Sequence, residues 1–351
     1  MSQDQSQEAL ERLRALIDTT SARGRWLVLM HDNPDPDALA AASGLSLLLR
    51  SHFRRRVTAA YGGLVGRAEN RAMLSVLGLR VSHTRHLNWK HYRHFALVDC
   101  QPRTGNNQLP VAVLPDVVID HHPARRATHQ VPFSDIRTEY GASATIVAEY
   151  LSAAGIPIPK KLATAIIYAI RTETQDFRRE FTHADKAVHD SLLPNIDNRA
   201  LARIQKPRLP LSYFATTHRA LEGLLAVETL VVTHLHEVDQ PDIVPEIADL
   251  LLRLEGKTWA LCTGAFETRL YLSIRTSNPR ADAGRLVRRL IGRRGKGGGH
   301  GMTAGGWVAL DEAPGSLNRQ AAIERLADYL GRRLATLLKK DPDRLSPVLL
   351  D

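Results

Sequence analysis

Short apolar runs alternate with longer helix-like stretches over the first half of the chain. Three runs rich in valine, leucine or isoleucine occupy residues 26–30, 95–99 and 116–120. Continuous apolar runs of this length are typical of strands buried on both faces of a parallel sheet. Apolar or amphipathic stretches predict helices at residues 38–53, 68–78, 141–155 and 159–174. The pattern therefore predicts an α/β domain whose parallel sheet is covered by helices.

Two further patterns lie on either side of this domain. Leucine and isoleucine recur at helical spacing over residues 5–17, which predicts an amphipathic helix that packs on the domain after it. Residues 194–212 contain prolines among basic residues and show no clear period, so we predict a domain connection there. We place a first domain at residues 1–193, a linker at 194–224 and a second domain at 225–351.

The second domain has a different pattern. Residues 258–277 predict two strands joined by a short turn, and residues 281–292 predict a basic amphipathic helix. A glycine-rich loop is expected at residues 295–306, and a closing helix at 316–340. This order predicts a smaller α/β domain that carries a glycine-rich loop.

Length and composition limit the class of protein. A chain of 351 residues that is 44% apolar can bury two cores. No stretch approaches the roughly 18 consecutive apolar residues of a membrane helix, and the polar first residues are unlike a signal peptide. We therefore expect a cytoplasmic protein with no membrane partner. Cys100 and Cys262 fit neither a disulfide framework nor a zinc-ligand spacing, so any metal must be bound by oxygen and imidazole.

The net charge points to an anionic partner. Lysine and arginine number 47 against 37 acids, which gives a formal charge of +10. Such a charge concentrates polyanions, and nucleic acid is the natural candidate. The simpler alternative is a solvated basic surface spread over the whole chain.

Ionisable side chains follow each of the three apolar runs. They are His31, Asp35 and Asp37 after the first, Asp99 at the second, and Asp120, His121 and His122 at the third. Because ligands of open parallel sheets bind outside the carboxyl ends of the strands, we expect these side chains to meet in one crevice. Carboxylates with a minority of imidazoles suit Mn²⁺ or Mg²⁺. Divalent cations would then offset the repulsion among the acids.

Each signal has a simpler explanation when it is taken alone. Asp35 and Asp37 can shape a turn and cap a helix, and Asp99 can cap a turn. An Asp–His pair is a common structural contact in protein cores. The combination of all three strand ends is what favours a metal site.

Four segments together resemble a known family. They are "HDNPDPDA", "LVDC", "VIDHH" and, far downstream, "GGGHGMTAG". They are similar to signatures of the DHH phosphoesterase superfamily with its DHH-associated C-terminal domain. The resemblance runs from about residue 25 to about residue 310 and keeps the order of the motifs.

The resemblance implies a site for two Mn²⁺ ions, with Mg²⁺ as the alternative. The implied ligands are His31 and Asp35 for one ion, Asp37 and His121 for the other, and Asp99 as the bridge. A further acidic ligand, usually aspartate in the family, aligns with Glu173. Asp176, about one helical turn away, is the alternative, and a surface acid at a helix end is the structural explanation for Glu173.

The resemblance also implies roles for Asp120 and His122. Asp120 would fix the tautomer and orientation of a neighbouring histidine. His122 would point toward the phosphate, as a donor to a nonbridging oxygen or as the proton source for the leaving alkoxide.

In the second domain, the resemblance implies substrate binding. Arg275 lies in a strand similar to the family's arginine-bearing strand and would clamp a phosphate. The glycine-rich segment would bind phosphate or base through Gly297, Gly298, Gly299 and His300. The chain departs from the family pattern at Lys296 and Thr303. By itself, a glycine-rich loop is more simply a flexible turn.

A basic run lies beside that segment, and it would suit a polyanion longer than one phosphate. It consists of Arg285, Arg288, Arg289, Arg293, Arg294 and Lys296. The alternative is a solvated helix face. Aromatic residues make up only 5% of the chain, so base stacking along a long strand is not obviously supported and a short substrate is favoured.

Several activities remain open within the resemblance. We favour a nanoRNase-like enzyme that converts short oligonucleotides or linear dinucleotides to nucleoside monophosphates. A further substrate would be 3′-phosphoadenosine 5′-phosphate, and a homodimer is a possible assembly. A RecJ-like single-strand exonuclease and a cyclic-dinucleotide phosphodiesterase are alternatives. An inorganic pyrophosphatase is disfavoured because that group lacks the GGGH segment. A regulator that binds metal or nucleotide without turnover is the non-enzymatic alternative.

Overall fold

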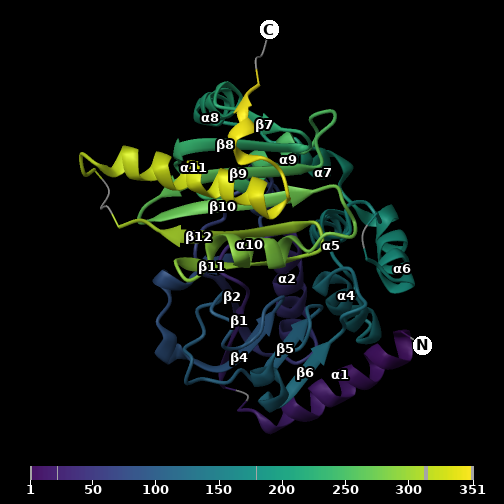
Figure 1. Cartoon of the computed structure of the whole chain (residues 1–351). Coiled ribbons are helices and arrows are strands. Elements are labelled where there is room, and N and C mark those ends of the chain that lie inside the picture. Colours follow the sequence, from purple (N-terminus) through teal and green to yellow (C-terminus); the bar gives the residue numbers. More distant parts are fainter. Residues whose placement is uncertain (1, 22, 179, 312–314, 349–351) are drawn as a thin grey trace. The chain divides into compact units, whose positions relative to one another are not determined.

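The chain consists of two compact units (Figure 1). The computed structural model describes residues 2–21, 23–178, 180–311 and 315–348, with the backbone alone for Ser2, Gln3 and His300. The first unit ends at Pro207, and the second begins at Arg208. The expected α/β fold class, with a parallel-sheet domain followed by a smaller mixed domain, is confirmed.

The first unit contains a six-stranded sheet in which every strand pair is parallel. In sheet order its strands are β3 (Val81–His83), β2 (Arg56–Tyr61), β1 (Arg25–Leu29), β4 (Tyr92–Val98), β5 (Val117–Asp120) and β6 (Phe133–Ile136). The predicted strands correspond to β1, β4 and β5, which are neighbours at the middle of the sheet. The sequence analysis missed β2, β3 and β6 because they are short or partly polar.

Helices share one apolar core with this sheet (Figure 1). They are α1 (Ser2–Thr19), α2 (Pro36–Ser51), α3 (Ala68–Leu77), α4 (Ser143–Ala153), α5 (Lys160–Glu173), α6 (His183–Leu192) and α7 (Asn198–Gln205). Short 3-10 turns lie at Thr84–His86, Trp89–His91, Arg126–Gln130 and Leu193–Asn195. Helix α2 packs on both α4 and α5. A Cβ on Gly44 of α2 would lie 2.7 Å from Val147 Cγ1 of α4, so glycine permits the close approach of these helices.

The stretch predicted as a domain connection, residues 194–212, contains the boundary between the two units and also a helix. Residues Asn198–Gln205 form α7, which Asp197 caps by accepting a hydrogen bond from the backbone of Ala200. Helix α7 buries Ile204 in the core of the first unit. Eight residues span only about two helical turns, so the apolar period was too short to recognise between the prolines.

The second unit is built on a seven-stranded mixed sheet. In sheet order its strands are β11 (Gly295–His300), β12 (Thr303–Ala309), β10 (Arg269–Thr276), β9 (Trp259–Phe266), β8 (Leu230–Glu237), β7 (Leu225–Val227) and β13 (Ser346–Pro347). Its helices are α8 (Leu211–Glu222), α9 (Ile243–Leu251), α10 (Ala283–Ile291), α11 (Arg319–Leu337) and the 3-10 turn Pro342–Arg344. Helices α10 and α11 share one apolar cluster with the sheet, and α8 and α9 share another.

The glycine-rich segment is a strand and not the expected loop. Residues Gly295–His300 pair with Thr303–Ala309 as an antiparallel hairpin at the edge of the sheet. A Cβ on Gly297 would lie 2.6 Å from Ile291 Cδ1, and one on Gly295 would lie 1.8 Å from the Trp307 carbonyl oxygen. Glycine at these positions therefore allows α10 and β12 to pack closely on β11. A loop is expected from the sequence because glycine is common in turns, but here glycine serves close packing.

Within the described ranges, no helix combines the length and the apolarity needed to cross a bilayer.

A buried arginine fixes the segment between β6 and α4. Arg137 has no exposed side-chain surface, and its guanidinium donates to Asp135, to Glu149 and to the hydroxyl of Ser6. These partners belong to β6, α4 and α1. The position at which α4 begins therefore depends on a fully paired buried charge.

We predict that Arg137→Met lowers the free energy of unfolding of the first unit by about 3–5 kcal/mol, because Asp135 and Glu149 lose their buried counter-charge. Hydrogen exchange of the α4 amides under native conditions measures this loss. Arg93→Met, at an exposed position of β4, serves as the control and should have little effect. A loss below about 1 kcal/mol in Arg137→Met would show that the carboxylates find other partners.

Candidate metal centre

The carboxyl ends of β1, β4 and β5 lie together because these strands are neighbours in the sheet. The structure brings five predicted ligands into one cluster at this edge: His31, Asp35, Asp37, Asp99 and His121. Two sets of three side chains offer potential metal ligands, and within each set the ligand atoms lie within 4.8 Å of one another. One set is His31, Asp35 and Asp99, and the other is Asp99, His121 and His122. The expectation that the strand ends converge is met.

Asp99 is common to both sets, and its two oxygens face different partners. Its Oδ2 lies 3.5 Å from His31 Nε2, while its Oδ1 lies 3.6 Å from His121 Nε2. Oδ1 also accepts a hydrogen bond of 3.1 Å from the hydroxyl of Ser143. The backbone of Asp99 has a φ of 55°, a left-handed conformation that aspartate tolerates better than most residues. This arrangement is suited to a carboxylate that bridges two cations.

Asp35 combines a structural contact with a position in the cluster. Its Oδ1 accepts a hydrogen bond of 3.0 Å from the backbone of Ala38 and caps α2, which begins at Pro36. Its Oδ2 lies 3.7 Å from His31 Nε2. Burial opposes the charged form of His31, but Asp35 and Asp99 raise its pKa well above the usual value. Burial opposes ionisation of Asp35 as well, yet contact with His31 lowers the pKa of that carboxyl to about 2.

Asp37 is held by the start of α4. Its two oxygens accept hydrogen bonds from the backbone of Ser143 and of Ala144, each 2.7 Å long. The positive end of the helix dipole therefore meets a buried carboxylate. Burial, with the charges of Asp99 and Asp35, nevertheless raises the pKa of Asp37 well above its usual value. The backbone donors alone do not compensate for the crowding of negative charge.

The tautomer of His121 is set by a backbone carbonyl. Its Nδ1 lies 3.1 Å from the carbonyl oxygen of Tyr140, which can only accept, so this nitrogen carries the proton. The lone pair of Nε2 in the neutral ring is then left facing Asp99 and Asp37, at 3.6 and 3.9 Å. Repulsion between this lone pair and the carboxylate oxygens is relieved by a cation between them or by a second proton on the ring. The donor set therefore fits a divalent cation held by oxygen and imidazole.

Glu173 and Asp176 lie in different surroundings. Burial and the charges of Asp35 and Asp99 raise the pKa of Glu173 to about 7, so this carboxyl shares the electrostatic field of the cluster. Asp176 pairs with Arg171 at 2.6 Å, and its side chain is 58% exposed. Glu173 is therefore the acid whose charge interacts with the cluster, and its role as a ligand stays a prediction.

Asp120 orients His122. The buried Oδ1 of Asp120 accepts hydrogen bonds from the backbone nitrogen and the ring Nδ1 of His122, at 3.1 and 2.9 Å. Its Oδ2 accepts one of 2.8 Å from Gln101. Burial opposes protonation of His122, but Asp120 and the charge of Asp99 raise the pKa of this ring to about 9. His122 is therefore held as a hydrogen-bond donor beside Asp99.

The sequence analysis missed two residues of this site. Ser143 donates to Asp99 and, through its backbone, to Asp37. Gln101 supports Asp120 through the oxygen that does not contact His122. Ser143 lies near the start of the helix predicted at residues 141–155, but its partners lie more than 40 residues away in sequence, so no local pattern shows the contact.

In the second unit, the structure aligns three positions across neighbouring strands. Arg275 of β10 pairs with Thr303 of β12, which in turn pairs with His300 of β11. Arg275 donates to Asp249 and to Ser273, so its guanidinium is already hydrogen-bonded within the unit. The side chain of His300 lies outside the described residues.

Gly297 packs against Ile291, whereas a Cβ on Gly298 would have open space around it, and Gly299 has a φ of +137°. The basic run is exposed along α10 and the start of β11; it comprises Arg285, Arg288, Arg289, Arg293, Arg294 and Lys296. Its charges are therefore available to solvent or to a ligand.

Comparison with known proteins matches each of the two units to a known domain family. The DHH family, N-terminal domain, matches residues 25–170, and the DHHA1 domain matches residues 227–332. An uncharacterized protein of Methanocaldococcus jannaschii is 31% identical over 287 residues, which cover 81% of this chain and 58% of the relative. The chain thus spans somewhat more than half the length of that relative.

Solved structures show the same fold. An exopolyphosphatase-related protein from Bacteroides fragilis is similar with a TM-score of 0.70 and 15% identity, over 95% of this chain and 98% of the other. A DHH domain from a member of the s1p family of ribosomal proteins is similar with a TM-score of 0.52 and 14% identity, over 97% of this chain and 92% of the other. At these identities the likeness concerns the fold alone.

We predict that Asp99→Ala weakens the binding of Mn²⁺ by more than about 100-fold, since one side chain faces both ligand sets. His122→Ala should change the affinity by less than about tenfold, because Asp120 directs that ring as a donor. Calorimetric titration of both variants measures the two affinities. Asp190→Ala, at an exposed acid of α6 that pairs with Lys186, is the charge-matched control. Equal losses in Asp99→Ala and His122→Ala would contradict the bridging role.

Proposed function

Because the chain belongs to the DHH phosphoesterase superfamily and joins a DHH domain to a DHHA1 domain, we propose that it is a two-metal phosphodiesterase. Its proposed substrates are short oligonucleotides or linear dinucleotides, which it hydrolyses to nucleoside monophosphates. The observation that carries the proposal is Asp99, whose oxygens face His31 on one side and His121 on the other.

The proposed ligands divide into two groups around Asp99. His31 and Asp35 would hold one cation, and Asp37, His121 and Glu173 the other, with Asp99 shared. When bound, two divalent cations lower the pKa of a nucleophilic water and neutralise the phosphoryl oxygens. The all-oxygen and imidazole donor set supports Mn²⁺, with Mg²⁺ as the alternative.

His122 supplies the proposed donor to the phosphate. With its Nδ1 directed at Asp120, the ring keeps Nε2 for a nonbridging oxygen or for the leaving alkoxide. Asp120 does not reach the substrate in this scheme; it acts as a positioning residue that holds the ring and its tautomer. The hydrogen bond from Gln101 to Asp120 keeps that carboxylate in place.

The second unit supplies the proposed substrate contacts. Strand β11 is the edge strand next to β12, so one side of its backbone has no strand partner in this sheet. Gly298 lies on this strand with open space where a side chain would be. A phosphate or base can therefore approach the backbone closely. We propose that the substrate is contacted there by Gly297, Gly298, Gly299 and His300. We also propose that Arg275 contributes positive charge from β10, where it is in register with Thr303 of β12 and, through it, with His300.

Hydrolysis of labelled substrates of graded length tests this function. We expect 5′-labelled RNA or DNA of two to four nucleotides to be cleaved with a higher kcat/KM than strands of about 24 nucleotides. Exhaustive chelation should abolish turnover, and added Mn²⁺ should restore it. Parallel reactions with 3′-phosphoadenosine 5′-phosphate and with cyclic dinucleotides define the range of substrates.

Activity that survives exhaustive chelation would exclude the two-metal proposal. Faster degradation of the long strand would instead assign a RecJ-like exonuclease, for which the exposed basic run of α10 offers a binding surface. Preferential opening of cyclic dinucleotides would assign a cyclic-dinucleotide phosphodiesterase.

We predict that Gly298→Ala raises KM for a dinucleotide by about tenfold or more and leaves the thermal stability unchanged, because the added methyl meets no protein atom within 4 Å. Steady-state kinetics and thermal unfolding of the purified variant measure the two effects. Gly223→Ala, with its added Cβ 3.4 Å from a carbonyl oxygen, is the matched control. An unchanged KM would place the substrate away from β11.

A further inference from the structure

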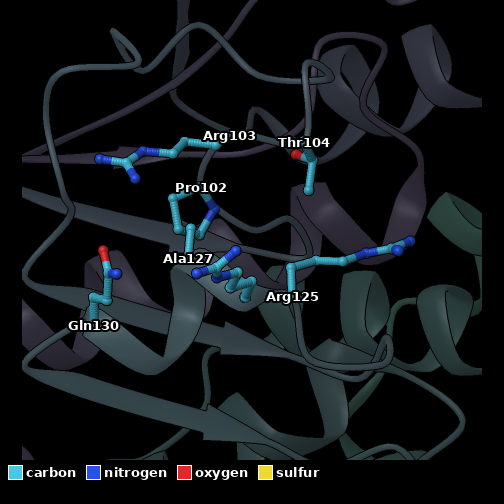
Figure 2. Close-up of a pocket in the computed structure, with 7 residues that line it drawn as sticks. Pro102, Arg103, Thr104, Arg125, Ala127 and Gln130 are labelled. Atoms are coloured by element: carbon cyan, nitrogen blue, oxygen red, sulfur yellow. The ribbon is translucent and has the colours of Figure 1, made fainter.

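A cationic pocket lies in the first unit, between residues that follow β4 and residues that follow β5 (Figure 2). Its cavity has a volume of about 670 Å³. The seven residues that line it are Pro102, Arg103, Thr104, Arg125, Arg126, Ala127 and Gln130. These residues follow β4 and β5, the two strands at whose ends Asp99 and the Asp120-His121-His122 sequence lie. The pocket and the candidate metal centre therefore share the same two loops.

One buried side chain joins this Arg pocket to the candidate metal centre. The Gln101 amide nitrogen donates to Asp120, and its oxygen accepts from the backbone nitrogen of Arg125 and the hydroxyl of Thr128, both at 2.7 Å. The loop that bears Arg125 is thus fixed to the carboxylate that orients His122. Movement of the pocket wall relative to His122 would break buried hydrogen bonds.

The charge in the Arg pocket is unbalanced. Three arginines and no acid line it. In the part of the chain that the structure describes, the guanidinium groups of Arg125 and Arg126 make no hydrogen bond or ion pair, while Arg103 donates from Nε to the carbonyl of Val111. Figure 2 shows Arg103 and Arg125 extending on opposite sides of Pro102. The backbone on both sides of the pocket has a fixed conformation. Arg103 has a left-handed φ of 62°, and Gln101 accepts a hydrogen bond from the backbone of the opposite loop. A basic surface that is only solvated would not need such fixed walls.

We propose that the Arg pocket binds a second phosphate of the nucleic-acid substrate, the one adjacent to the phosphate that is cleaved. This inference rests on the proposed function and names a contact for the substrate within the first unit. Guanidinium groups match phosphate oxygens through paired N–H donors. The cavity is within the size range of small-molecule sites. Pro102 and Ala127 add apolar surface for a sugar or base, and Gln130 adds a polar group.

The proposal separates two classes of substrate. A 5′-phosphorylated dinucleotide carries a phosphate besides the scissile one and can use the Arg pocket. Bis(p-nitrophenyl) phosphate has a single phosphate and cannot. Loss of the pocket should therefore affect the first substrate and spare the second.

The double substitution Arg125→Ala and Arg126→Ala tests the pocket by kinetics. It keeps the Arg125 backbone nitrogen that donates to Gln101. We expect kcat/KM for 5′-phosphorylated diadenylate to fall by about 10- to 100-fold, mostly through KM, with turnover of bis(p-nitrophenyl) phosphate within about twofold of the wild type. Arg80→Ala with Arg93→Ala removes the same charge from exposed positions of the same unit and is the matched control.

A binding measurement keeps this test independent of turnover. Fluorescence anisotropy with 5′-phosphorylated, 3′-fluorescein-labelled diadenylate in a chelating buffer reports binding alone. We expect the slope of log affinity against log salt to become shallower by about 0.7 in the pocket variant, the change for one lost phosphate contact, and by much less in the control variant. Inorganic tripolyphosphate serves as a competitor that carries phosphate without nucleoside.

Each outcome decides between the two proposals. Equal losses in the pocket and control variants, or equal losses on both substrates by a folded pocket variant, would overturn the Arg pocket. Arginine-dependent binding of tripolyphosphate with unaffected diadenylate turnover would reassign the pocket to inorganic polyphosphate. A wild-type protein that binds diadenylate through the pocket but cleaves no phosphodiester would refute the proposed function and retain the pocket.

Discussion

Repulsion among carboxylates at one edge of the parallel sheet is the constraint on which the site depends. Asp35, Asp37 and Asp99 lie within a few ångströms of shared histidine partners, and Asp37 is almost fully buried. The protein offsets part of this cost with backbone donors, since α4 points its first amides at Asp37 and α2 is capped by Asp35. The remaining negative charge is what makes the cluster suited to divalent cations.

The order of the strands converts distant segments into one site. Strands β1, β4 and β5 are adjacent in space although they lie far apart in the chain, so their last residues meet at the same edge. The start of α4 closes this edge, and Arg137 fixes the segment that leads into α4. Stability of the fold and geometry of the site therefore depend on some of the same buried polar contacts.

Local sequence patterns predict which side chains meet at the end of the sheet but not the residues that hold them there. Buried parallel strands are continuous apolar runs, so the strands before His31, Asp99 and His121 were recognisable, and with them the cluster. Gln101 and Ser143 act through long-range contacts that no local pattern encodes. The sequence predicts a loop where β11 lies, because the reason for the glycines of this strand, close packing by α10 and β12, exists only in the folded unit.

Strand β11 also bears on self-association. An edge strand exposes unpaired backbone groups, which can recruit the edge of another molecule. Here the edge is rich in glycine, so an added strand would find few side chains to pack against, and the exposed arginines before it would repel a second copy. The same absence of side chains that leaves the backbone accessible to a small ligand thus discourages the growth of an intermolecular sheet.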